Sequence, residues 1–106
     1  NKVDVEIAER TLDAVASPLR EDIQSAVSKA VHANHPDTPI VPDQAPYYTD
    51  GTIFRVAGIP TYGVSSVFLK DNDSFAHGLN ERLPVDAFYN GLGHWYVLIQ
   101  SLAGGQ

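Results

Sequence analysis

The residue with the clearest capacity for chemistry is His77, which begins the polar run His-Gly-Leu-Asn-Glu-Arg over residues 77–82. An imidazole beside a glycine, in a polar loop with acidic residues nearby, is a setting in which a fold can present one ligand to a metal ion. One ligand is not a site, and composition alone favours a solvated loop histidine. Because the sequence contains no cysteine, any metal bound here must be held by histidine and carboxylate side chains.

The other three histidines fit structural roles better. His32 and His35 are three residues apart at the end of a predicted helix, where a cationic imidazole complements the negative end of the helix dipole. His94 lies beside Trp95 in the last predicted helix, off its apolar stripe, so we expect it to pack or to lie on the surface rather than to bind a metal.

A second candidate is the run Thr49-Asp50-Gly51, which opens a short predicted helix that extends to Ala57. Thr49 or Asp50 suits the capping position of that helix, and free backbone amides at a helix N-terminus also suit a carboxylate ligand. Gly58 follows at the position where a left-handed backbone ends many helices. The pattern favours helix capping as the main role and leaves carboxylate binding as the alternative.

Three strands and two longer helices are expected around these runs. Alternating or β-rich apolar residues predict strands over 2–9, 39–42 and 59–68. A helix is predicted from Ser17 as its N-cap and Pro18 as its first residue, closing at His35-Pro36. The last helix, which ends at residue 102 or 103, is predicted from an apolar stripe made of Val85, Phe88, Tyr89, Leu92, Tyr96 and Ile99.

After the first strand, the order helix, strand, helix, strand, helix predicts an α/β fold in which helices cover a layered sheet. This sheet is incomplete on its own, because two core strands leave edges and apolar faces unpaired. We therefore expect the segment to complete a larger sheet or to associate with another chain, and a homodimer is one such association.

Bulk properties exclude some partners. The 106 residues suffice for one small domain, and the net charge of −6 with seven scattered Lys and Arg residues does not suit a nucleic acid backbone. The apolar stretches fall short of the roughly 18 residues that cross a bilayer, so neither nucleic acid nor membrane is expected as a partner. The absence of cysteine is compatible with either the cytoplasm or the periplasm.

Residues 49–63 and 77–82, followed by a long amphipathic helix, resemble the C-terminal part of the catalytic domain of the dinuclear zinc aminoacylase/carboxypeptidase family. This family includes glutamate carboxypeptidase, carboxypeptidase S and succinyl-diaminopimelate desuccinylase. The likeness covers roughly residues 17–103. It implies a phosphorylase/hydrolase-like layered sheet, with 1–10 as the last strand of an insertion (lid) domain and 11–106 as the C-terminal segment of the catalytic domain.

The resemblance also implies roles for single residues. His77 would be a ligand to the second zinc ion of a pair that hydrolyses a peptide or an N-acyl amino acid. Asn80, Glu81 and Arg82 would support the metal loop, while Thr49, Asp50 and Gly51 would bind the substrate carboxylate. Pro-Tyr-Tyr at 46–48 departs from the small residues common in the family, which puts the substrate in doubt.

In the family, the remaining zinc ligands and the general-base glutamate precede the insertion domain, and no such motif is present here. No catalytic residue is therefore assigned to this segment, which we expect to be inactive alone and to bind little or no zinc. The alternative is a non-catalytic α/β interaction module without metal. The two hypotheses differ at His77, which should be paired inside the fold in the module but unpaired at a cleft edge in the enzyme.

Overall fold

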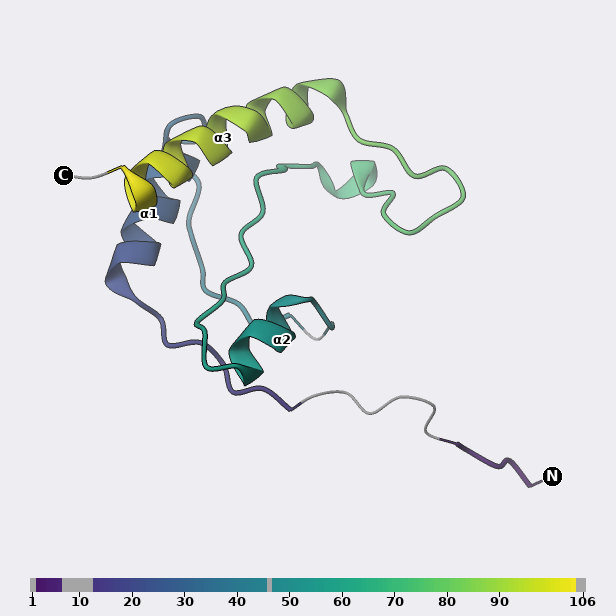
Figure 1. The fold of residues 1–106 in the computed structure, drawn as a ribbon. Helices are drawn as coiled ribbons and strands as arrows, with labels where there is room; N and C mark the ends of the chain where they lie inside the picture. The colour runs from purple at the N-terminus through teal and green to yellow at the C-terminus, as the bar shows by residue number, and fades with distance from the viewer. Residues whose placement is uncertain (1, 7–12, 46, 105–106) are drawn as a thin grey trace. The chain divides into compact units, whose positions relative to one another are not determined.

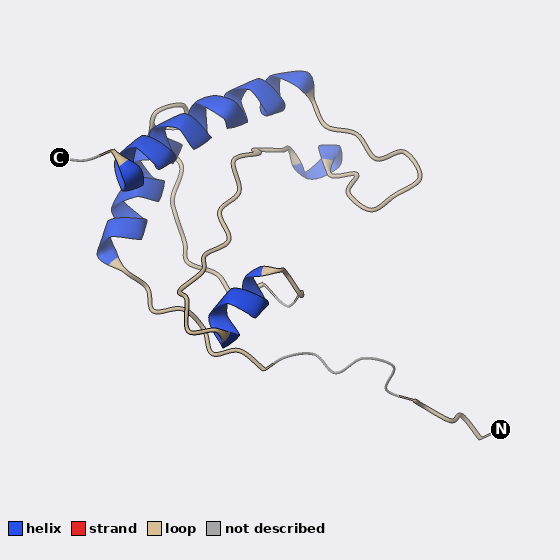
Figure 2. Ribbon diagram, in the orientation of Figure 1, coloured by secondary structure: helices blue, strands red, loops and turns tan. Residues whose placement is uncertain are grey.

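The computed structural model describes residues 2–6, 13–45 and 47–104, and every regular element in this part of the chain is helical (Figures 1 and 2). The elements are the helices α1 (Glu21–His32), α2 (Gly51–Val56) and α3 (Val85–Ala103) and the 3-10 helix η1 (Asp71–Asp73). They fall into two compact units. The α2 unit comprises Asn1–Pro18 and Gln44–Gly63, and the helix-pair unit comprises Leu19–Asp43 and Val64–Gln106.

The predicted α/β layered sheet is wrong, because none of the described residues forms a strand. Residues 39–42 and 59–68 belong to extended or irregular segments with no ladder partner. Pro39 and Pro42 have no amide hydrogen to donate to a sheet. Ser65 Oγ accepts a hydrogen bond from the Val67 amide and donates one to the Val67 carbonyl, each at 3.3 Å, so local bonds replace a ladder there.

The first predicted strand is only partly described. Val3 and Val5 are more than 80% exposed, at 83% and 84%, and residues 2–6 are not paired with any other described segment. Residues 7–9 of that strand, and 7–10 of the proposed lid-domain segment, lie outside the described residues.

The helix-pair unit is built from α1 and α3, which pack against each other. Its core consists of Ala26 and Ala30 of α1 against Leu98 of α3. Small residues in α3 let neighbouring segments of the chain approach the helix closely. A Cβ atom added at Gly91 would lie 3.0 Å from Ser66 Oγ and 3.2 Å from the Ser66 carbonyl oxygen, so only glycine fits there without a shift.

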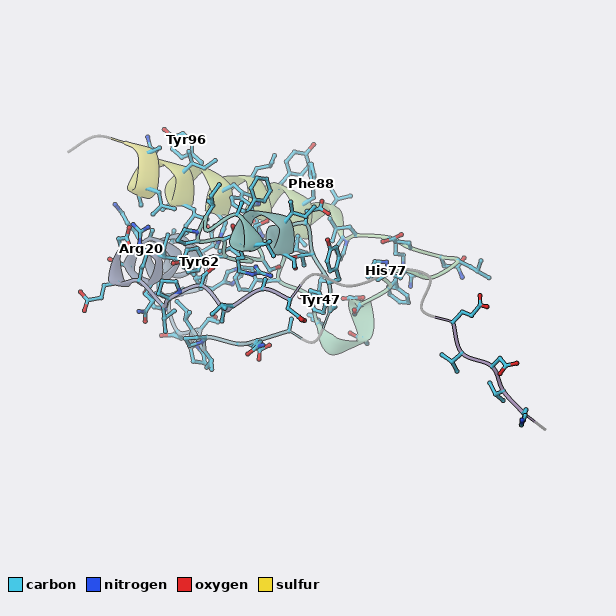
Figure 3. The ribbon with its side chains drawn as sticks, turned by 60° about the horizontal axis from the view of Figure 1, so that its bottom comes forward. Arg20, Tyr47, Tyr62, His77, Phe88 and Tyr96 are labelled. Atoms are coloured by element: carbon cyan, nitrogen blue, oxygen red, sulfur yellow. The ribbon has the colours of Figure 1, made fainter. Side chains whose placement is uncertain are left out.

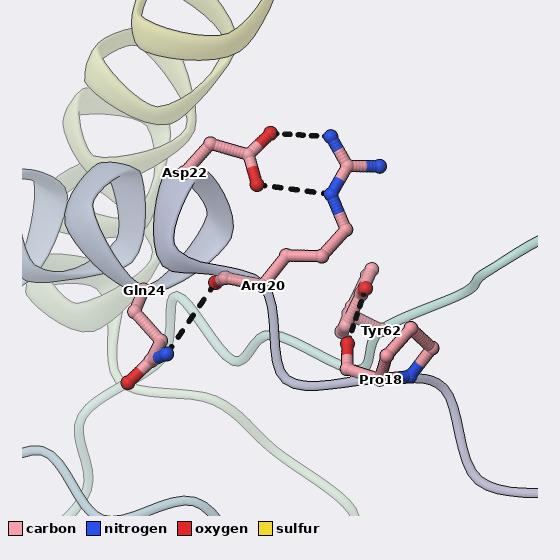
Figure 4. Close-up of polar contacts among 5 residues, drawn as sticks. All are labelled: Pro18, Arg20, Asp22, Gln24 and Tyr62. Carbon is pink, nitrogen blue, oxygen red and sulfur yellow. Dashed lines mark hydrogen bonds and ion pairs between the residues drawn. The ribbon is translucent and has the colours of Figure 1, made fainter.

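α1 begins at Glu21, with Arg20 as an N-cap that makes no side-chain capping bond, and not at Ser17-Pro18 as predicted. Arg20 instead pairs with Asp22 through two hydrogen bonds, and this guanidinium lowers the pKa of the Asp22 carboxyl (Figure 4). Gln24 Nε2 donates to the Arg20 carbonyl at 3.5 Å.

Within the α2 unit, Ser17 is engaged elsewhere than at a helix end. Its hydroxyl donates to the Thr61 carbonyl at 2.9 Å and accepts from the Thr61 amide at 2.8 Å. The Tyr62 hydroxyl donates to the Pro18 carbonyl at 2.6 Å (Figure 4). These bonds tie residues that are 44 positions apart, which is why the local capping pattern was misleading.

The predicted stop of α2 is confirmed. Gly58 has φ of +82°, its amide donates to the Arg55 carbonyl at 2.9 Å, and the Ile59 amide donates to the Phe54 carbonyl at 2.9 Å. This pair of bonds is a Schellman motif, which satisfies two carbonyls at the helix end and requires a left-handed residue.

No helix in the described ranges combines the length and the apolar character needed to cross a bilayer.

Candidate functional site

His77 lies in the loop that connects η1 to α3 (Figure 3). The base of this loop is closed by a cation–π contact, with the Arg82 guanidinium carbon 3.3 Å from the centroid of the Phe75 ring. Inside the loop, the Glu81 amide donates to the Gly78 carbonyl at 3.3 Å. The charged side chain of Arg82 therefore fixes the two ends of the segment that carries the imidazole.

The backbone of His77 has φ of +60°, the one left-handed non-glycine residue in the part of the chain that the structure describes. Such a conformation costs a residue with a Cβ atom on the order of 1–2 kcal/mol. The side chain is exposed, and its ring has no hydrogen-bond or ion-pair partner among the described residues. Both ring nitrogens are thus available to a ligand.

The three residues expected to support His77 have polar contacts within the loop but none with the His77 ring in the described structure. Arg82 Nη1 donates to the Asn80 carbonyl at 3.5 Å, in addition to its contact with Phe75. The Asn80 and Glu81 side chains are exposed, and no hydrogen bond or ion pair between either side chain and the His77 ring is present in the described structure.

A metal site needs more ligands than His77. No group of three or more His, Cys, Asp or Glu side chains close enough to hold a metal is present in residues 2–6, 13–45 and 47–104. These residues therefore offer one exposed ligand and do not by themselves build a zinc site, which takes at least three protein ligands.

In the α2 unit, the three residues expected to bind a substrate carboxylate lie at the start of α2. Asp50 is the N-cap residue but its side chain makes no capping bond, while the Thr49 carbonyl accepts the Thr52 amide at 3.0 Å. A Cβ atom added at Gly51 would be 3.1 Å from Arg55 Nη1 and 3.2 Å from Thr49 Oγ1, so the guanidinium lies close against the helix start.

Arg55 was not singled out from the sequence. It donates through Nη2 to Thr52 Oγ1 at 3.1 Å, and it lies four residues after Gly51, which is one turn further along the same helix face. That spacing is the signal that could have placed a cation beside the start of α2.

His94 packs in the helix-pair unit, which is one of the two roles expected for it. It is 1% exposed, and neither ring nitrogen has a hydrogen-bond partner in the described part of the structure. Burial lowers its pKa, and the charge of His35 lowers it further. The Phe68 ring neighbours both histidines, with its centroid 4.1 Å from that of His35 and 6.2 Å from that of His94.

Two cavities lie in the helix-pair unit. One of about 130 Å³ is next to the loop base and is lined by Asp73, Phe75, Arg82, Leu83 and Pro84. The other, of about 300 Å³, is bounded by residues that include His35, Phe68, Lys70 and Asp86. His77 lines neither of these cavities.

Comparisons of the chain with protein-family models, with curated proteins and with solved structures found no match.

Proposed function

We propose that this chain is the C-terminal segment of a zinc-dependent carboxypeptidase or N-acyl amino acid hydrolase, to which it contributes His77 as one metal ligand. The observation that carries the proposal is the state of this residue: an exposed imidazole without a hydrogen-bond partner, in a strained left-handed conformation, in a loop closed by Arg82 and Phe75. Strained backbone at an unpaired polar residue is typical of functional sites.

The resemblance of residues 49–63 and 77–82 to the zinc aminoacylase/carboxypeptidase family supports the same proposal. A zinc pair, when bound, polarises the scissile carbonyl and lowers the pKa of a bound water. His77 would bind as the neutral imidazole, and the Arg82–Phe75 contact would limit the movement of its loop. The further ligands must come from outside the described residues.

In the α2 unit, we propose that Thr49, Asp50 and Gly51 face the carboxylate of the substrate, with the Arg55 guanidinium as the group that attracts it. The support is the closeness of the Arg55 guanidinium to Gly51 at the start of α2. A guanidinium binds a carboxylate through two parallel hydrogen bonds, which gives both affinity and orientation.

A metal-free interaction module is the second candidate. It is favoured by the large apolar side chains that α3 exposes, which include Phe88, Tyr96 and Ile99 at 51%, 63% and 57%. Exposed apolar patches of this kind mark interaction surfaces in general.

The test is to purify the product of the gene that encodes this chain and to measure its zinc content and its hydrolysis of a panel of N-acyl amino acids. The variant His77→Ala should lose about one zinc equivalent and reduce hydrolysis more than about 100-fold. His32→Ala removes an exposed histidine outside the loop and is the matched control, with both quantities unchanged. A zinc-free wild type, or a His77→Ala variant with full zinc and activity, would contradict the proposal.

A further inference from the structure

α3 has a second apolar face whose large side chains are exposed in the described structure (Figure 3, where Phe88 and Tyr96 are labelled). Eight large apolar residues of this helix are each at least 41% exposed. We call them the α3 stripe: Val85, Phe88, Tyr89, Leu92, Trp95, Tyr96, Ile99 and Leu102.

The stripe is distinct from the face that packs on α1. With about 100° of rotation per residue, the stripe occupies an arc of about 140°, whereas the buried residues Ala87, Gly91, His94 and Leu98 fall in a neighbouring arc. The single carboxylate of α3, Asp86, lies outside both arcs. The stripe is therefore continuous and carries no charge, so like charges do not oppose contact with an identical surface.

The area of the stripe matches that of a stable interface. Its four aromatic side chains, at about 200 Å² each, leave about 440 Å² exposed, given their exposed fractions of 51%, 65%, 41% and 63%. The four aliphatic side chains bring the total near the roughly 800 Å² that each partner contributes to a standard protein interface.

Apart from Leu102, the residues of the stripe are placed symmetrically about Leu92. Aromatic pairs precede it by four and three residues, as Phe88-Tyr89, and follow it by three and four, as Trp95-Tyr96. Val85 and Ile99 lie seven residues away on either side. This spacing of seven, three and four is that of helices that pack side by side.

We propose that α3 is the interface of a homodimer in which two α3 helices pack antiparallel across a two-fold axis at Leu92. In this arrangement Phe88 faces Tyr96 of the second copy, Val85 faces Ile99, and Leu92 meets its own equivalent. The symmetry favours a second copy over an unlike partner, because a two-fold interface requires each surface to complement itself. The test of this inference needs neither zinc nor substrate, so its outcome is read separately from that of the hydrolase proposal.

The experiment is sedimentation equilibrium of the 106-residue chain from about 1 to 100 μM, with far-UV circular dichroism to check helicity. The wild type should reach twice its mass of 11.5 kDa. Leu92→Glu and Leu92→Lys each place two like charges at the axis and should weaken dimerisation at least about tenfold. An equimolar mixture of the two variants should restore the dimer, because opposite charges then meet.

The matched control is Asn90→Glu, which adds the same charge at an exposed position of α3 outside the stripe. It should dimerise as the wild type does. A wild type that stays monomeric at 100 μM overturns the proposal, and cosedimentation of that monomer with lipid vesicles would assign the stripe to a lipid surface instead. A mixture of the two charged variants that stays monomeric, or equal weakening by Asn90→Glu, also overturns it.

Discussion

At the scale of single residues, His77 combines an unpaired imidazole with a backbone conformation that only glycine adopts without cost. The strain can be measured separately from the chemistry. His77→Gly and His77→Ala both remove the imidazole, but only glycine relieves the left-handed backbone. We expect His77→Gly to have a free energy of unfolding about 1 kcal/mol higher than His77→Ala, measured by urea denaturation. Equal stability of the two variants would show that the loop does not hold residue 77 at positive φ.

His94 should make stability depend on pH. Burial lowers its pKa from 6.5, and the charge of His35 lowers it further. The unfolded chain then binds more protons than the folded one as pH falls below about 6.5, so the free energy of unfolding decreases from there down to the folded pKa.

His94→Leu removes both the titrating group and two buried nitrogens without partners. Between pH 7 and pH 5, we expect this variant to lose less unfolding free energy than the wild type, and at pH 7 to be at least as stable. Urea denaturation at several pH values measures both quantities. An unchanged pH slope in His94→Leu would mean that the imidazole is already solvated in the folded protein.

At the scale of elements, two glycines of α3 have opposite environments. A Cβ atom at Gly91 would press on Ser66, including its carbonyl oxygen, whereas the nearest atom to a Cβ at Gly93 is Asn34 Nδ2 at 3.8 Å. Gly93→Ala should therefore stabilise the protein by up to about 1 kcal/mol through helix propensity alone.

Gly91→Ala gains the same propensity but should be destabilised by about 1–3 kcal/mol because the backbone at Ser66 must move. Each variant adds one methyl group to α3, so the thermal unfolding midpoints of the two can be compared directly. A stabilised Gly91→Ala would show that the segment around Ser66 does not pack closely on α3.

Gly58 offers a test of how α2 ends. It has φ of +82° with no atom within 4 Å of an added Cβ, so Gly58→Ala introduces backbone strain without a clash. We expect a loss of about 1 kcal/mol in the free energy of unfolding. Gly63→Ala, in equally open space but without positive φ, is the control and should be near neutral. Similar effects of the two substitutions would contradict the Schellman motif at the end of α2.

The sequence predicted helices better than strands for a physical reason. The bonds of a helix are local, so the stripe of α3 and the glycine after α2 were enough to locate these helices. A strand requires a partner, and 59–68 has the composition of a strand without one. Long-range bonds such as Ser17 to Thr61, and the strain at His77, depend on the folded chain and leave no local pattern.

The stripe of α3 also shows why a periodic pattern does not identify the buried face. Six of its eight large residues were predicted correctly as one side of a helix, yet they are exposed, while Ala87, Gly91 and Leu98 face the interior. Small residues permit close packing of α1 on α3, whereas the large residues of α3 remain exposed and available for contact with another surface. At the candidate site, His77 was singled out from its motif and Arg55 could have been placed by its spacing from Gly51, but the Arg82–Phe75 contact required coordinates.

At the scale of the whole molecule, the single tryptophan reports on association. Trp95 is 41% exposed and belongs to the α3 stripe, so the proposed dimer removes its indole from water. Dilution from about 100 μM to below the dissociation constant should shift the Trp95 fluorescence to longer wavelength. The midpoint of thermal unfolding, followed by the same fluorescence, should fall over the same dilution.

Leu92→Glu should keep the long-wavelength emission and the lower midpoint up to concentrations at least about tenfold higher than the wild type does, since its dimerisation is weakened. Asn90→Glu should follow the wild type. Because dimerisation stabilises only the folded state, both the emission and the midpoint of the wild type must change over the same range of concentration. An emission spectrum that is independent of concentration, in a wild type that sediments as a dimer, would place the interface away from α3.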